Sequence, residues 1–418
     1  MKKKVALHNL GCKVNAYELE AMQEMLEKAG YEIVPFAPGA DVYIINTCTV
    51  TNIADRKSRQ MLHKARKMNP EAIVIAAGCY VQAQKNMENI DDAIDIVLGN
   101  NRKQDLLFVL ENYKKGSGQE KDLISLDKPV EYEELQLSST GEHTRAYLKV
   151  QDGCNQFCSY CIIPYVRGRV RSRRKEEVLE EVLRLTKNGY QEFVLTGIHL
   201  SSYGVDCEDN LLELIKAVHE IEGVKRIRLG SLEPRIITEE FAQALGNMPK
   251  ICPHFHLSLQ SGCDETLKRM NRHYTTEEYY DKVALLRRVF ANPAVTTDVI
   301  VGFPGETEEE FAVTKRFLEK VNFFEMHVFK YSRRRGTVAA AMDNQVPEQV
   351  KAQRSAGLLE LERQQSAAYR QGYIGNEITI LTEEAREIDG KEYRVGHTET
   401  GSASAARRLL PSRTRSAA

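Results

Sequence analysis

Short apolar runs alternate with amphipathic segments along most of the chain. In the first hundred residues, runs rich in Val, Ile and Ala are followed by segments whose apolar positions recur every three or four residues. The apolar runs lie at residues 5–10, 41–47, 72–78 and 94–99, and the amphipathic segments lie at residues 15–30 and 53–68. Strand and helix alternating at this spacing predict a parallel, doubly wound sheet.

The alternation stops and then resumes. Residues 114–142 are polar, acidic and rich in turn-forming residues, which predicts a domain linker that could include a short strand. Six further β-like runs follow at residues 146–151, 192–197, 226–231, 254–259, 296–302 and 325–330. Six βα units predict a partial or complete βα barrel, in which chemistry gathers at the C-terminal ends of the strands.

The end of the chain has a different pattern. Residues 347–375 predict a helix, and residues 376–398 predict the start of a small β domain. The tail that follows is rich in Ser, Ala and Arg without strand alternation, so we expect it to be disordered. The expected α/β architecture therefore has domains at residues 1–113, 143–370 and 371–398, a linker at residues 114–142 and a tail at residues 399–418.

Composition narrows the class of protein. The chain has 418 residues, of which 42% are hydrophobic, and a net charge of −1. The apolar run near its start is interrupted by His8 and Asn9, so it reads as a strand rather than a signal peptide, and no later run is long enough for a membrane span. We therefore expect a cytoplasmic protein without a membrane partner. Nine cysteines in a reducing compartment indicate metal binding or catalysis rather than disulfides.

Three cysteines follow the β-like run at residues 146–151. Cys154, Cys158 and Cys161 form the pattern C-x3-C-x2-C in "DGCNQFCSYC". Three thiolates on a tight loop can hold three irons of a 4Fe-4S cluster and leave the fourth iron open for a small ligand. The alternative is a structural zinc site closed by a distant residue such as His143 or His199, although zinc sites more often use paired C-x2-C motifs.

A second set of three cysteines is spread over the first eighty residues. Cys12, Cys48 and Cys79 each follow a predicted parallel strand. Because the C-terminal ends of such strands lie along one edge of a sheet, these residues can meet in space and hold a second cluster. The alternative is three buried thiols that act as small core side chains.

These motifs together resemble the methylthiotransferases of the radical S-adenosylmethionine (SAM) superfamily. The stretches that carry the resemblance include "LGCKVNAYELEAM", "NTCTVTNIADRKSRQ", "AGCYVQ", "DGCNQFCSYCIIPYVRGRVRSR" and "HFHLSLQSGCDETLKRMNR". The resemblance covers roughly residues 1–395 and implies a flavodoxin-like N-terminal sheet, a radical SAM partial barrel and a TRAM-like β domain. Only the first part of the TRAM-like domain is similar, which predicts that this domain is incomplete.

The resemblance also implies cofactors, partners and a reaction. Two 4Fe-4S clusters and SAM would be the cofactors, and SAM would serve as both methyl donor and radical source. Cys154, Cys158 and Cys161 would hold the radical-generating cluster, and Cys12, Cys48 and Cys79 would hold the auxiliary cluster. Partners would be tRNA, an electron donor such as flavodoxin or ferredoxin, and a sulfur source.

The family contains branches with different substrates. The stretches "GCKVNAYE", "NTCTVTNIADRKSRQ" and "GIHLSSYG" are most similar to the branch that adds a methylthio group to C2 of threonylcarbamoyladenosine (t6A) next to the tRNA anticodon. The alternatives are isopentenyladenosine in tRNA and an aspartate of a ribosomal protein. A more remote alternative is a non-catalytic RNA-binding protein with an iron–sulfur or zinc site.

Other residues near predicted strand ends are candidates for supporting roles. We expect cofactor or substrate contacts from Tyr160, Glu233, Ser258, Gln260 and Asp298. The basic run after the cysteine loop could bind RNA phosphates through Arg167, Arg169, Arg171 and Arg173. A solvated charged face at a helix start is the alternative for this run, although the helix dipole does not favour arginines there.

Overall fold

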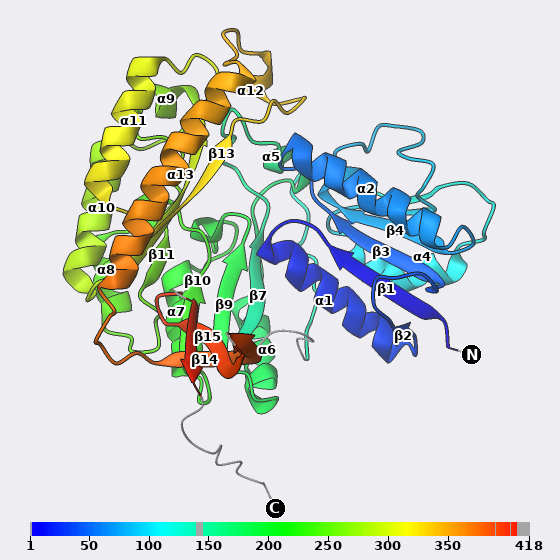
Figure 1. Cartoon of the computed structure of the whole chain (residues 1–418). Coiled ribbons are helices and arrows are strands. Elements are labelled where there is room, and N and C mark those ends of the chain that lie inside the picture. The colour runs from blue at the N-terminus through cyan, green and yellow to red at the C-terminus, as the bar shows by residue number, and fades with distance from the viewer. Residues whose placement is uncertain (1, 139–144, 389, 402, 408–418) are drawn as a thin grey trace, which may run out of the picture.

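The computed structural model describes residues 2–138, 145–388, 390–401 and 403–407, and Figure 1 shows their arrangement. The described strands form one six-stranded sheet near the N-terminus, a strongly curved central set of strands, and a small antiparallel sheet near the C-terminus. This confirms the predicted α/β class and the order of its parts.

The N-terminal sheet is parallel, with the strand order β2-β1-β3-β4-β5-β6. Its strands are β1 (Lys4–Asn9), β2 (Glu32–Ile33), β3 (Val42–Thr47), β4 (Ile73–Gly78), β5 (Ile96–Leu98) and β6 (Glu120–Asp122). The first five strands follow the doubly wound order of flavodoxin-like proteins, as the alternating pattern predicts.

Helices cover both faces of this sheet because successive strand residues point to opposite sides. Ile45 of β3 packs with Leu62 of α2 (Asn52–Met68), whereas Ile44 packs with Met22 of α1 (Lys13–Lys28). The shorter helices of this region are α3 (Cys79–Gln82), η1 (Lys103–Asp105) and α4 (Leu106–Asn112).

The segment predicted to be a linker contributes to the fold. Strand β6 lies within it and extends the N-terminal sheet. Farther along, Leu135 and Leu137 are buried against Tyr17 and Ala21 of α1. Residues 114–138 therefore pack as structure rather than as a free tether, while the end of the predicted linker lies outside the described residues.

The central strands form an open barrel. Its strands are β7 (Arg145–Asp152), β8 (Arg171–Ser172), β9 (Glu192–Gly197), β10 (Arg226–Leu229), β11 (His254–His256), β12 (Ala294–Val301) and β13 (Glu325–Lys330). Two ladders, β10-β9-β7-β8 and β11-β12-β13, are joined by parallel bridges from Ile227 to Ile251 and from Leu232 to Leu257. Apart from the short antiparallel β8, neighbouring strands run parallel, so their C-terminal ends share one mouth.

Helices surround the outside of this partial barrel (Figure 1). The helices of this region are α5 (Ile163–Val166), α6 (Lys175–Lys187), η2 (Leu200–Ser202), α7 (Leu211–Glu220), η3 (Pro234–Ile236), α8 (Glu239–Gly246), α9 (Asp264–Arg269), α10 (Thr276–Val289), α11 (Glu308–Val321), α12 (Val338–Ala341) and α13 (Glu348–Gln371). The short α5 lies instead toward the N-terminal region, where it packs with Cys79. Local sequence fixes some starts: Thr275 and Thr307 form capping boxes with Glu278 and Glu310. Among the described helices, none has the length and apolar composition to cross a membrane.

The C-terminal sheet contains β14 (Ile380–Ile388), β15 (Lys391–Thr398) and β16 (Ala403–Arg407). It docks on the barrel through arginines: Arg145 donates to Glu383 at 2.9 Å, and Arg228 donates to the carbonyl oxygen of Glu399 at 3.0 Å. The expectation of a disordered tail from residue 399 is wrong for β16, because these residues pair with β15. Residues 408–418 lie outside the described part of the chain.

Candidate active site

The loop that carries Cys154, Cys158 and Cys161 begins where β7 ends, at the mouth of the partial barrel. Gly153 starts this loop with a φ of +71°, and a Cβ at this position would lie 1.8 Å from the carbonyl oxygen of Arg169. Only glycine fits such a close approach of two backbone segments. The strand end and this glycine together turn the cysteines into the mouth.

The three thiols are free and largely shielded from solvent. Burial, with a smaller contribution from the charge of Cys158, raises the pKa of Cys154 to about 11 and that of Cys161 to about 12. Three thiolates this close would repel one another without a compensating cation. The donor set, soft sulfur atoms on a tight loop, fits a 4Fe-4S cluster.

A first cavity of about 140 Å³ lies directly beside these cysteines. Four of the residues expected to contact cofactor line it: Tyr160, Glu233, Ser258 and Gln260. Asp298, the fifth residue expected to contact cofactor or substrate, lines a second cavity instead of this one.

Two further residues line this first cavity, Arg272 and His199, and the sequence analysis did not predict this role for either of them. Arg272 donates to the Cys158 sulfur at 3.3 Å and lies over the Tyr274 ring at 4.9 Å. The Nδ1 atom of His199 lies 2.6 Å from the Ser202 hydroxyl, and its Nε2 atom is buried without a partner among the described residues. The position of His199 just after a strand is a signal that could have found it, whereas Arg272 lies outside the strand-end pattern.

The second cysteine set lies at the edge of the N-terminal sheet. Cys12, Cys48 and Cys79 follow β1, β3 and β4, which are neighbours in the strand order. A Cβ at Gly11 would lie 3.1 Å from the Cβ of Cys48, so the loop after β1 contacts the loop after β3. Asn100 donates a hydrogen bond to the Cys79 sulfur at 3.5 Å.

The electrostatics of this set match those of the first. Burial, with smaller contributions from the charges of Cys79 and Cys12, raises the pKa of Cys48 to about 11. All three thiols are free. The structure thus brings together the residues that the sequence placed at three strand ends, and their donor atoms also fit an iron–sulfur cluster.

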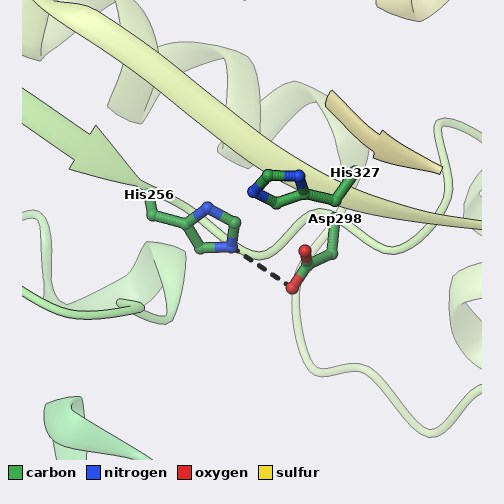
Figure 2. Close-up of side chains that lie close together, drawn as sticks. All are labelled: His256, Asp298 and His327. Atoms are coloured by element: carbon green, nitrogen blue, oxygen red, sulfur yellow. Dashed lines mark hydrogen bonds and ion pairs between the residues drawn. The ribbon is translucent and has the colours of Figure 1, made fainter. Parts of the chain in front are cut away.

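A second cavity of about 520 Å³ adjoins the first one and reaches Cys12 of the second cysteine set. It is lined by Cys12 and Lys13 on one side and by barrel residues on the other, and it shares Ser231 with the first cavity. Figure 2 shows three of its barrel residues, His256, Asp298 and His327, on β11, β12 and β13. Their ligand atoms lie within 4.8 Å of one another, close enough to hold a divalent metal ion.

The basic run after the cysteine loop is mostly buried. Arg167, Arg171 and Arg173 expose at most 2% of their surface, so the structure contradicts the expectation that they bind RNA phosphates. Arg173 instead pairs with Glu181. Arg169 is half-buried, and its guanidinium lies 4.6 Å from the centre of the Phe157 ring.

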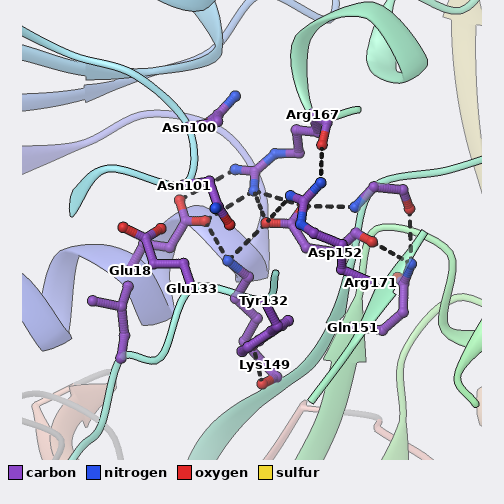
Figure 3. Close-up of polar contacts among 12 residues, drawn as sticks. Glu18, Asn100, Asn101, Tyr132, Glu133, Lys149, Gln151, Asp152, Arg167 and Arg171 are labelled. Carbon is purple, nitrogen blue, oxygen red and sulfur yellow. Dashed lines mark hydrogen bonds and ion pairs between the residues drawn. The ribbon is translucent and has the colours of Figure 1, made fainter. Parts of the chain in front are cut away.

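Arg167 belongs to a buried polar network between the N-terminal sheet and the barrel (Figure 3). It donates to Glu18 of α1 at 2.9 Å, to Asp152 of β7 at 3.1 Å and to Asn15 at 2.7 Å. Lys149 also pairs with Glu18, at 2.9 Å. The network therefore ties the helix that follows Cys12 to the strand that precedes Cys154.

Comparison with protein families gives two matches. Residues 148–318 match a family model described as the Radical SAM superfamily, and residues 4–99 match one described as Uncharacterized protein family UPF0004. The matched regions contain the two cysteine sets.

Curated relatives cover nearly the whole chain. A threonylcarbamoyladenosine tRNA methylthiotransferase of Bacillus subtilis is 44% identical over 94% of this chain and 88% of its own. The protein of the same name from Aquifex aeolicus is 39% identical over 95% of this chain and 98% of its own. A tRNA-2-methylthio-N(6)-dimethylallyladenosine synthase of Clostridium botulinum is 36% identical over 94% of this chain and 88% of its own.

A solved structure shares the fold. The radical SAM methyltransferase TsrM from Kitasatospora setae superposes with a TM-score of 0.59 over 80% of this chain and 76% of its own, at 16% identity. At this identity the match supports the arrangement of sheet and partial barrel.

Proposed function

The chain belongs to the methylthiotransferases of the radical SAM superfamily, and we propose that it adds a methylthio group to C2 of t6A in tRNA, next to the anticodon. One observation carries the proposal beyond family membership. The cavity beside the C-x3-C-x2-C loop adjoins a larger cavity that reaches Cys12 of the second set. A nucleobase in the larger cavity would lie between the two cysteine sites.

Both cysteine sets fit the cofactors of this reaction. The SAM-binding cluster would be held by Cys154, Cys158 and Cys161, and the auxiliary cluster by Cys12, Cys48 and Cys79. When bound, SAM and the two clusters supply the radical that removes the hydrogen from adenine C2 and the methylthio group that replaces it. An electron donor such as flavodoxin or ferredoxin and a sulfur source complete the proposal.

The residues around the first cavity position these groups. Arg272 donates to the Cys158 sulfur and so orients one cluster ligand. Arg235 donates to Glu233 at 2.7 Å and fixes a carboxylate at the cavity wall. We assign Glu233, Ser258 and Gln260 to polar contacts with SAM, because this small cavity presents these groups next to the cysteine loop.

The lining of the second cavity favours t6A over an isoprenoid-modified adenosine. Its wall carries Lys13, His254, His256, Asp298 and His327 among other residues. A dimethylallyl group offers these polar side chains no hydrogen-bonding partner, whereas a threonylcarbamoyl group has a carboxylate, a hydroxyl and amide groups. The cavity volume lies within the usual range for ligand sites, about 300–1,000 Å³.

Nucleoside mass spectrometry tests the proposed function. In tRNA from a strain that lacks this activity, expression of the chain should convert t6A into its 2-methylthio derivative. Cys48→Ala and Cys154→Ala should each abolish the product, whereas Cys207→Ala, at an exposed thiol outside both sets, should retain it. Product from either cluster-site variant would reject the assigned roles. A methylthio group found only on isopentenyladenosine or in a ribosomal protein digest would reject the substrate.

A further inference from the structure

The second cavity has one wall from the barrel and one from the N-terminal sheet region. Lys13 is the first residue of α1 and follows Cys12, whereas the facing side chains come from β11, β12 and β13. His327 and Lys13 line the same cavity, although more than three hundred residues separate them in the sequence. The cavity therefore exists only because the two parts pack together.

Most charged and polar groups on the barrel wall already have partners. His256 is held on both ring nitrogens: Nδ1 lies 3.0 Å from the Thr296 hydroxyl and Nε2 lies 3.2 Å from Asp298 (Figure 2). The carboxylate of Glu325 accepts a hydrogen bond from Arg370 at 2.7 Å. These contacts hold His256 and Asp298 in place and pair the Glu325 carboxylate with a guanidinium.

Three basic groups of this cavity have a nitrogen without a hydrogen-bond partner among the described residues: Lys13, His327 and the buried Nδ1 of His254. Burial lowers the pKa of His254 to about 3, so this side chain carries no positive charge to offer an anion. Lys13 has no ion pair or side-chain hydrogen bond among the described residues. His327 stacks on His256 with ring centres 5.7 Å apart, and within the described part of the chain its nitrogens have no hydrogen-bond partner. A cavity with a free ammonium and a free imidazole favours a ligand with a carboxylate, because each donor gains a charge-assisted hydrogen bond.

We propose that Lys13 and His327 are the specificity-determining residues that bind the carboxylate of the threonylcarbamoyl group. This inference rests on the proposed function and deepens it. Lys13 pairs with the carboxylate from the side of the auxiliary cysteines, and His327 donates to it from the barrel. The modified adenine is then held by its own substituent while C2 stays accessible.

A metal ion on His256, Asp298 and His327 is the competing arrangement for the same side chains. The hydrogen bonds to both nitrogens of His256 favour direct recognition, because a metal would have to displace one of them. Lys13 has no place in a metal site, since an ammonium is not a ligand. The effect of its substitution therefore separates the two arrangements.

The test uses the cluster-loaded enzyme and anticodon stem-loop RNAs that carry either t6A or t6A with its carboxyl group as a methyl ester. The wild-type enzyme should prefer the acid over the ester about tenfold or more in kcat/KM. Lys13→Met should remove most of this preference through a higher KM for the acid, and His327→Phe should reduce it. Lys28→Met, at the exposed end of the same helix, is the matched control and should keep the full preference.

The outcomes separate the two levels of the proposal. If the wild type makes no 2-methylthio product from the t6A stem-loop, the proposed function fails. If the wild type makes product but uses acid and ester equally, or if Lys13→Met retains the preference, the carboxylate site is wrong. If EDTA removes the preference and Zn²⁺ restores it, the metal arrangement replaces direct recognition. Iron content and SAM cleavage in each variant show that its clusters are intact.

Discussion

Replacing Glu18 by Gln should uncouple the N-terminal sheet from the barrel. The Glu18 side chain is fully buried, and its carboxylate pairs with Arg167 at 2.9 Å, Lys149 at 2.9 Å and Lys103 at 3.3 Å. Glutamine keeps the shape but removes the negative charge, so three buried cations lose a common counter-ion. Removing one partner of a buried ion pair costs about 3–5 kcal/mol.

This cost predicts a large change in thermal stability. For a folding unit of 150–250 residues, 1 kcal/mol corresponds to roughly 2–4 °C, so the melting temperature should fall by about 6–20 °C. Differential scanning fluorimetry of the cluster-loaded enzyme measures this change. Glu27→Gln, at an exposed position of the same helix, should shift the melting temperature by little. A shift for Glu18→Gln as small as that of Glu27→Gln would refute the reasoning.

The pH dependence of the same variant gives an independent check. Burial alone would raise the pKa of Glu18, but Arg167, Lys103 and Lys149 outweigh it and hold the pKa well below its usual range. A carboxylate with a depressed folded-state pKa stabilises the protein above its unfolded-state pKa of about 4.3, and this stabilisation is lost as the pH falls. The difference in stability between wild type and Glu18→Gln should therefore be full at pH 7 and should shrink below about pH 4.

Two further substitutions test the cysteine sites. Gly153→Ala should prevent loading of the SAM-binding cluster, because the added Cβ would meet the Arg169 carbonyl oxygen. Gly39 also has a positive φ but has open space around it, so the control variant Gly39→Ala should load its clusters fully. The iron content per chain measures cluster loading in both variants. Asn100→Leu removes the hydrogen bond to Cys79 and should lower the reduction potential of the auxiliary cluster, as followed by an EPR-monitored titration. An unchanged potential would exclude Asn100 as a tuning residue.

Much of the fold follows from local patterns that the sequence displays. The alternation of strands and helices predicted both the parallel sheet and the partial barrel. Each strand or helix could be identified from the spacing of the apolar residues within its own short segment. The same pattern predicted that Cys12, Cys48 and Cys79 lie at strand ends. Parallel topology then brings those ends to one edge without further information.

Features that depend on contacts between residues far apart in the chain could not be predicted from the sequence. The run from Arg167 to Arg173 resembles an RNA-binding patch in sequence, but Arg167 is buried against Glu18, which lies 149 residues away in the sequence. The same limit applies to β16, whose Ser- and Ala-rich residues become a strand only by pairing with β15. The presence of Lys13 and His327 in one cavity also depends on how the N-terminal sheet region and the barrel pack together.

The placement of α1 has a practical consequence for building chimeric enzymes. Its buried face is shared: Met22 packs on the N-terminal sheet, whereas Tyr17 packs on the segment before β7 and donates to the Leu135 carbonyl oxygen at 2.6 Å. A graft that exchanges the N-terminal region between relatives at a boundary near residue 113 would leave Tyr17 and Glu18 facing a foreign surface. A transplantable unit must therefore carry α1 together with its matching surface around Lys149 and Arg167.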